Sequence, residues 1–163
     1  MPLFRKRIKL DSLDRKALTL LSRQGRATWA ELGQLLGLSA PSAADRVRKL
    51  EEQGVIRGYA ALLDPPSVGY ALTAYVSVSL ASHRHRASFL RGIEKLEQIC
   101  ECHHVAGDDD YLLKLRCRDA EDLDRLLVVQ LKEKLGVART RTTIVLSTAK
   151  ESVRVPIAEN SED

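Results

Sequence analysis

The sequence has no long apolar run and few cysteines, and both absences limit what the chain can be. No apolar stretch in it approaches the roughly 20 residues that a membrane-spanning helix needs. The opening MPLFRKRIKL is basic but lacks the apolar segment of a signal peptide, so we expect a cytoplasmic protein with no membrane partner. The three cysteines are an odd number, which argues against a disulfide framework. No phosphate-binding loop, cofactor fingerprint or grouping of serine, histidine and carboxylate appears, so no cofactor is expected.

Charge is distributed unevenly along the chain. Met1–Ala60 carries 12 basic and 6 acidic residues, a net charge of +6, whereas Ala61–Asp163 carries 14 and 16, a net charge of −2. Lysine and arginine side chains that neutralise phosphates release condensed counterions, which favours an anionic polymer as the partner of the first segment. The overall content of 44% apolar and 29% charged residues is ordinary for a globular protein.

Residues 29–53 are typical of two short helices joined by a tight turn, a helix-turn-helix. The first helix has an apolar face formed by Leu32, Leu35 and Leu36. Gly37 suits the left-handed conformation that ends helices. Ser39 is the expected N-cap of the second helix, and Pro41 fits its first turn because no intrahelical N–H is lost there.

The second of these helices is expected to bury one stripe and to expose another. The buried stripe consists of Ala44, Val47 and Leu50. The exposed face is polar and basic, of the kind that enters a major groove about 12 Å wide. It consists of Ser42, Asp45, Arg46, Arg48 and Lys49. The alternative is an ordinary helical hairpin with a solvated charged face.

Another apolar helical face, expected to begin at Asp11 or Ser12, precedes this motif and completes a small three-helix core. The segment after the motif is extended in character. Asp64-Pro65-Pro66 then prevents a continuing helix, because proline restricts its own φ and the residue before it. We place the domain boundary between Leu62 and Gly69.

Beyond this boundary the pattern alternates between strands and helices. The expected order is βαββαβ, with strands at 71–80, 99–106, 109–117 and 137–147 and helices at 84–96 and 120–131. This order predicts a ferredoxin-like antiparallel sheet with both helices on one face. Apolar positions such as Tyr75, Leu113 and Ile144 would leave the other face in need of cover, so at least a dimer is expected.

A tight hairpin is expected at Gly107-Asp108, where the two central strands meet. Asp108, Asp109 and Asp110 lie at this turn, and like charges so close resist ionising together unless a cation offsets them. The turn is either simply solvated or an effector site. In the second case, backbone groups around the glycine bind a ligand carboxylate and an aspartate receives the ligand's ammonium group.

Two cysteines and a histidine raise the question of a metal. On the expected strand, Cys100, Cys102 and His104 point to one face and His103 to the other. Cysteines two apart on a strand are more often small core residues than ligands, and no second pair at zinc-finger spacing follows. No metal site is therefore predicted.

Four segments together carry a specific resemblance. They are LDRKALTLLSRQGRATWAELGQLLGLS, DRVRKLEEQGVIRGYAALLDP, ECHHVAGDDDYLLKLR and TRTTIVL. Over nearly its whole length the sequence resembles the Lrp/AsnC family of bacterial transcriptional regulators. The resemblance implies an α+β protein with an N-terminal winged-type helix-turn-helix domain and a C-terminal ferredoxin-like ligand-sensing domain. It also implies dimers that assemble into tetramers or octamers, with an amino-acid effector held between dimers.

By position, the resemblance assigns effector contacts to two segments. One side of the site consists of Val105, Ala106, Gly107, Asp108 and Asp110. The opposing wall consists of Thr142, Thr143 and Ile144. Asp109 stands where the family usually has an aromatic residue, which motivates the hypothesis that the effector is polar or cationic.

We predict two kinds of DNA contact in the first domain. Base edges are expected to face Ser42, Ala43 and Arg46. Phosphates are expected to bind Arg26, Thr28, Arg48 and Lys49. The family often has proline directly after the capping serine, whereas this chain has Ala40 and then Pro41, so its base preference can differ.

Two other functions are possible on this architecture. A siroheme-decarboxylase-like enzyme would use basic and histidine side chains of the second domain, such as His83, Arg84, His85 and Arg86. An amino-acid sensor without DNA binding would not need a basic second helix. We favour the regulator, and not an enzyme, because the charge of the first segment would otherwise have no purpose.

The expected organisation follows from these predictions. Residues 1–62 form the DNA-binding domain, 63–70 the hinge, 71–157 the effector-binding and oligomerisation domain, and 158–163 a disordered tail. The partners are double-stranded operator DNA and a small effector, and the protein is expected to be associated with the nucleoid.

Overall fold

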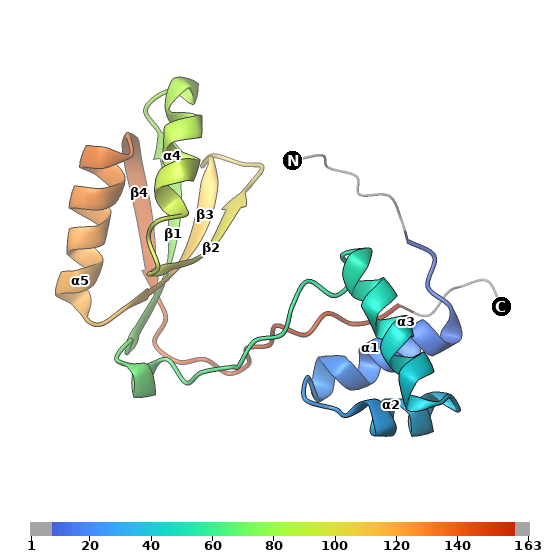
Figure 1. Cartoon of the computed structure of the whole chain (residues 1–163). Helices are drawn as coiled ribbons and strands as arrows, with labels where there is room; N and C mark the ends of the chain where they lie inside the picture. The colour runs from blue at the N-terminus through green and yellow to red at the C-terminus, as the bar shows by residue number, and fades with distance from the viewer. Residues whose placement is uncertain (1–7, 159–163) are drawn as a thin grey trace. The chain divides into compact units, whose positions relative to one another are not determined.

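The computed structural model describes residues 8–158, which divide into two compact units (Figure 1). We call residues 8–61 together with 151–158 the N-terminal unit, and Leu62–Lys150 the C-terminal unit. Each unit has its own apolar core. No helix among the described residues is long and apolar enough to cross a membrane. The expected disordered tail lies outside the described residues, apart from Ala158.

Three helices build the N-terminal unit: α1 (Ser12–Arg23), α2 (Trp29–Leu36) and α3 (Ala40–Glu52). Each begins after a capping side chain, because the first N–H groups of a helix have no partner within it. Asp11 and Thr28 cap α1 and α2 in reciprocal capping boxes, and Ser39 accepts the Ser42 N–H of α3 at 3.3 Å. Gly37 ends α2 with φ of 67°. The predicted helix-turn-helix and its cap and stop residues are confirmed.

The core of the N-terminal unit differs from the prediction at two positions. Its central cluster consists of Ala17, Leu21, Leu32, Leu36, Ala43 and Val47, and Leu50 is buried as well. Leu35 is 47% exposed and Ala43, not Ala44, completes the buried stripe of α3. With Val47 and Leu50, either alanine satisfies helical spacing, so the sequence alone could not choose between them.

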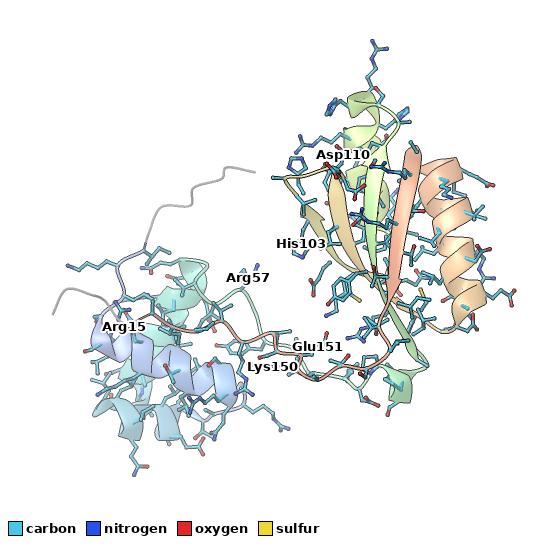
Figure 2. The ribbon with its side chains drawn as sticks, turned by 180° about the vertical axis from the view of Figure 1, so that it is seen from behind. Arg15, Arg57, His103, Asp110, Lys150 and Glu151 are labelled. Atoms are coloured by element: carbon cyan, nitrogen blue, oxygen red, sulfur yellow. The ribbon has the colours of Figure 1, made fainter. Side chains whose placement is uncertain are left out.

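The C-terminal segment packs on α1. Ile157 lines a groove of about 450 Å³ together with α1 residues and Leu35. The Arg15 guanidinium donates hydrogen bonds to the Ala158 and Leu10 carbonyl oxygens (Figure 2). Residues 151–158 therefore belong to the N-terminal unit, whereas the second domain was expected to continue to residue 157. The described part of the N-terminal unit contains no strand, so the segment after α3 is extended and does not form a β-hairpin wing.

Four antiparallel strands form the sheet of the C-terminal unit in the order β2-β3-β1-β4. They are β1 (Leu72–Leu80), β2 (Ile99–His104), β3 (Tyr111–Cys117) and β4 (Val137–Ile144). The helices are α4 (Arg86–Ile93), preceded by a 3₁₀ turn (His83–His85), and α5 (Ala120–Arg125), continued by a π-helical segment (Leu126–Lys134). A further 3₁₀ turn (Pro66–Val68) precedes β1. The predicted βαββαβ ferredoxin-like fold is confirmed.

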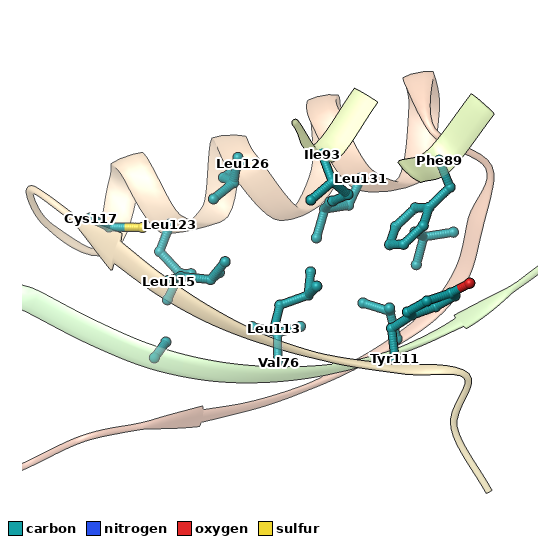
Figure 3. Packing of buried hydrophobic residues seen from close by; sticks show 13 residues of the cluster. Val76, Phe89, Ile93, Tyr111, Leu113, Leu115, Cys117, Leu123, Leu126 and Leu131 are labelled. Atoms are coloured by element: carbon teal, nitrogen blue, oxygen red, sulfur yellow. The ribbon is translucent and has the colours of Figure 1, made fainter. Parts of the chain in front are cut away.

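Both helices pack on one face of this sheet, and we call the other the open face. Phe89 and Ile93 from α4 and Leu131 after α5 contact the buried strand side chains (Figure 3). Val76 lies opposite Leu113 and Thr142, and the alternate position Tyr75 lies opposite Lys114 and Thr143.

This register corrects one expectation about the open face and refines another. Leu113 is fully buried on the helix side, so the expectation that it needs cover is wrong. Ile144 lies opposite the buried Ala74 and is 48% exposed at the edge strand. Tyr75 lies on the open face and is 38% exposed, as expected.

The register of β2 separates Cys100 from Cys102, the two cysteines considered above as metal ligands. Cys102 lies opposite Leu113 and His104 opposite Tyr111, so both share the helix side. A register shift between Ile99 and Glu101 leaves Cys100 without an opposite partner, so the common face expected for all three side chains is not formed by this register. Within residues 8–158 no group of three or more histidine, cysteine or acidic side chains is arranged to hold a metal ion.

Candidate functional site

The exposed surface of α3 is polar. The exposed residues of the helix are Pro41, Ser42, Asp45, Arg48 and Lys49, followed by Glu51 and Glu52 in its last turn. Arg48 Nη1 lies 2.8 Å from Asp45 Oδ1, with side chains that are 65% and 62% exposed. Because an ion pair so exposed contributes little free energy, Arg48 can exchange Asp45 for a phosphate at small cost.

Ala43 lies on the opposite side of the same helix. It is fully buried in the core of the N-terminal unit. The prediction that Ala43 faces base edges is therefore wrong. A small apolar residue near a helix N-terminus is compatible with either position until the packing partners of the helix are known.

Arg46 is held by α1. Its Nη1 lies 2.7 Å from Asp11 Oδ2 and 2.6 Å from Asp14 Oδ1, and the side chain is 26% exposed. The hydrogen bond with Asp11 raises the pKa of Arg46, and the Asp14 N–H lowers the pKa of Asp11. Arg46 thus joins α3 to the capping box of α1 through Nη1, and its contact with base edges stays a prediction.

Replacing Arg46 by alanine is expected to destabilise the N-terminal unit by about 1–2 kcal/mol, because two neighbouring carboxylates lose their shared cation. Chemical denaturation followed by circular dichroism measures this cost. Arg48→Ala is the matched control, and its partner is as exposed as Arg48 itself. Equal stability of the wild type and the Arg46→Ala variant would contradict this structural role.

Arg26 and Thr28 lie in the connection between α1 and α2, and both are exposed. The Thr28 hydroxyl is 2.8 Å from Glu31 Oε2, and its oxygen accepts the Glu31 N–H at 3.2 Å. Thr28 therefore caps α2 in this structure, whereas no bond from Arg26 to another described residue is formed.

The β2–β3 loop, residues 105–110, is longer than the two-residue hairpin expected at Gly107-Asp108. The strands stop at His104 and resume at Tyr111, and the Val105 N–H donates to the Asp110 carbonyl at 3.1 Å. The expectation is wrong because Asp110 is tied to β1 and does not continue the ladder. Its N–H donates to the Val78 carbonyl at 2.9 Å, and its Oδ2 accepts the Leu80 N–H at 2.7 Å.

Several backbone N–H groups at the top of this loop have no hydrogen-bond acceptor among the described residues. Gly107 has φ of 146°, which side chains rarely permit. The N–H groups of Ala106, Gly107, Asp108 and Asp109 donate no hydrogen bond to any residue among 8–158. Four consecutive free donors can bind an anionic group.

Asp109 is the buried member of the three aspartates. Its side chain is 6% exposed and is covered by two arginines of β4, with Nη2 of Arg139 at 3.2 Å and Nη2 of Arg141 at 2.8 Å. The Ser79 hydroxyl donates to Oδ1 at 2.9 Å. This hydrogen bond, with the two guanidinium groups, lowers the pKa of Asp109. Because its oxygens are occupied, the basis for a cationic effector paired with Asp109 is removed.

Sequence reasoning missed Arg139 and Arg141. Both lie on the open face, opposite Ser79 and Ser77 of β1. They are about 30 residues from Asp109 in the sequence, and alternation along β4 was the one signal that could have grouped them.

The opposing wall is divided between the two faces of the sheet. Thr143 lies on the open face opposite Tyr75. Thr142 lies opposite the buried Val76, and Ile144 opposite Ala74, so both belong to the helix side. Among the three predicted wall residues, the register therefore places Thr143 alone on the face that carries Arg139 and Arg141.

The basic and histidine run of the enzyme alternative lies on the 3₁₀ turn before α4 and at the start of that helix. His83, Arg84, His85 and Arg86 are all exposed. His85 packs against Gly136, where an added Cβ would lie 2.8 Å from its Nδ1. The run thus has the exposure of a solvated turn.

Comparisons with known proteins agree across both units. Residues 10–51 match the AsnC-type helix-turn-helix domain, and residues 73–155 match the Lrp/AsnC ligand binding domain. The leucine-responsive regulatory protein of Escherichia coli is 41% identical over 150 residues, which cover 91% of this chain and 92% of the relative.

Two solved structures extend the likeness to the fold. A transcriptional regulator of Neisseria meningitidis in complex with L-methionine has a TM-score of 0.85 and 32% identity over 91% of this chain and 97% of its own. A feast or famine regulatory protein of M. tuberculosis, complexed with L-methionine, has a TM-score of 0.84 and 35% identity over 90% and 99%.

These matches favour the regulator over the enzyme alternative and over a sensor without a DNA-binding domain. The chain belongs to the Lrp/AsnC family, and it is a transcriptional regulator with a helix-turn-helix DNA-binding domain and a ligand-binding domain, not an enzyme.

Proposed function

We propose that the exposed face of α3 contacts operator DNA and that an amino acid bound at the β2–β3 loop changes this binding. On α3, Ser42 contacts base edges, and Arg48 and Lys49 bind phosphates. Ser39 and Pro41 set the start of the helix, and Arg26 adds a phosphate contact beside α2. The observation that supports the DNA surface best is that these side chains are exposed, whereas Ala43 is buried and Arg46 is paired with Asp11 and Asp14.

The effector proposal depends on the loop. The free N–H groups of residues 106–109 suit the α-carboxylate of an amino acid. Its ammonium group is placed at Asp108, which is exposed, or at Asp110, whose Oδ1 has no hydrogen-bond donor among the described residues. The two relatives solved with L-methionine support an amino acid as the class of effector.

The open face of the sheet supports the proposal of a dimer. Tyr75 is partly exposed there without cover from the helices. A second copy would cover this face, and association of dimers into tetramers or octamers would bring effector loops together. Each dimer would present two α3 helices to half-sites about one DNA turn apart, or a multiple of it. The cytoplasm and the nucleoid are the proposed location.

An effector can change DNA binding only if it binds one assembly more tightly than another. We therefore expect it to shift the oligomeric state or the DNA affinity, and linkage requires that DNA shift the effector affinity by the same factor.

Titration with all twenty amino acids in a thermal-shift assay tests the effector proposal. At 100 times its dissociation constant, an effector stabilises the folded state by about 2.7 kcal/mol, which is easily detected. We expect one or a few chemically related amino acids to raise the melting temperature. Gly107→Val, which strains the loop, should abolish the shift, whereas Gly25→Ala, in the N-terminal unit, should preserve it. Absence of a shift with every amino acid would contradict the proposal.

A further inference from the structure

The side chain of the effector would meet Arg139 and Arg141. Asp109 is 6% exposed, whereas the two arginine side chains above it are 64% and 72% exposed. The arginines therefore cover the carboxylate and present their own outer edges to solvent. Although three aspartates crowd the loop, its surface toward β4 is cationic.

The guanidinium groups keep donors available. Both arginines reach Asp109 through Nη2, and no bond from Nε or Nη1 of either one to residues 8–158 is formed. A guanidinium fork matches the spacing of carboxylate oxygens and binds them through two parallel hydrogen bonds. Asp109 holds both guanidinium groups, and the Ser79 hydroxyl also accepts from Arg139. This reduces the conformational entropy that the two arginines would lose on binding a ligand.

The arginines are part of the same site as the loop. Arg139 Nη2 lies 3.3 Å from the Asp108 carbonyl oxygen, next to the free N–H groups. On β1 the residues directly opposite them are Ser79 and Ser77, and Tyr75 is the next residue along the open face. An aliphatic effector side chain placed against the guanidinium groups and these two serines would desolvate them without replacing their hydrogen bonds.

We propose that the effector is an amino acid with a second carboxylate, such as aspartate or glutamate, and that Arg139 and Arg141 select it. This inference rests on the proposed effector site. The α-carboxylate would bind the loop N–H groups and the side-chain carboxylate the outer donors of the two arginines. Asp109 acts as a positioning residue, because it orients the arginines and does not itself meet the ligand.

Isothermal titration of the full-length protein with aspartate, glutamate, asparagine, glutamine, leucine, methionine and lysine tests the inference. We expect aspartate or glutamate to bind at least about tenfold more tightly than the isosteric amide, because a charge-assisted pair is about twice as strong as a neutral hydrogen bond. Arg141→Gln and Arg139→Gln should each weaken that binding about tenfold and narrow the difference between acid and amide.

Arg91→Gln, an exposed arginine of α4, is the matched control and should leave binding unchanged. Melting without ligand shows whether each variant is folded. If a variant unfolds, the comparison of acid with amide binding to the wild-type protein still tests the inference. If leucine, methionine, lysine or an amide binds more tightly than aspartate and glutamate, the acidic effector is wrong but the proposed effector site is not contradicted. Binding of none of the seven, while another of the twenty amino acids shifts the melting temperature, would also overturn this inference alone. A lack of response to all twenty would overturn both proposals.

Discussion

Replacing Leu32 by alanine is expected to destabilise the N-terminal unit by about 2–5 kcal/mol and to abolish DNA binding. Leu32 is fully buried and contributes to the core that joins α1, α2 and α3. Truncation removes its transfer free energy and leaves a cavity that the short helices cannot fill. A loss of this size approaches the whole stability of a small domain.

Leu32→Ala should leave the C-terminal unit folded, because the core of that unit around Val76, Phe89 and Leu113 shares no residue with the core of the N-terminal unit. Hydrogen exchange resolved by peptide measures each unit separately, and fluorescence anisotropy with a labelled duplex measures DNA binding. Leu35→Ala is the matched control on the same helix, since Leu35 is 47% exposed. Equal losses of stability in the Leu32→Ala and Leu35→Ala variants would contradict this account of the cores. Equal loss of hydrogen-exchange protection in both units of Leu32→Ala would contradict it as well.

Replacing Arg48 and Lys49 together by alanine is expected to weaken DNA binding about 10- to 100-fold without lowering stability. Each phosphate contact contributes about 0.9 to the slope of log affinity against log salt concentration, so losing two should reduce this slope by about 1.8. Both side chains are exposed, and the pair of Arg48 with Asp45 is too exposed to matter for folding. The weakening should be the same for specific and unrelated duplexes, because phosphates carry no sequence information.

The control for this variant removes the same charge from another helix. Lys16 and Arg23 are exposed residues of α1, and their double alanine variant should change the salt slope by much less. Anisotropy titrations at several salt concentrations provide both slopes. Similar slopes for the two double variants would mean that net charge, and not the α3 surface, determines DNA binding.

The sequence predicts the features of this fold that depend on local signals. Asp11, Thr28 and Ser39 place the helix starts because only a few side chains cap N–H groups well. Alternation and helical spacing predict the order βαββαβ. The length of the β2–β3 loop was not predicted, because the N–H and side chain of Asp110 form hydrogen bonds with β1 and do not extend the β2–β3 hairpin.

The candidate site could be predicted only in part. The positions of Ser42 and Lys49 on the exposed face of α3 follow from spacing within one helix. The pairs of Arg46 with Asp14 and of Arg141 with Asp109 each join residues 32 positions apart, and no local pattern indicates which charges meet. In both cases the partner changed the interpretation: Arg46 became a structural cation and Asp109 a buried anion.

The central claim is that one unit binds DNA while the other senses an amino acid and alters that binding. Sequencing the genomic fragments that the purified protein retains at increasing salt, with and without each amino acid, tests it most directly. We predict salt-sensitive retention of fragments that share a recurring motif, and a change in their recovery with one class of amino acid. Retention that is insensitive to salt, or recovery that no amino acid changes, would contradict the claim.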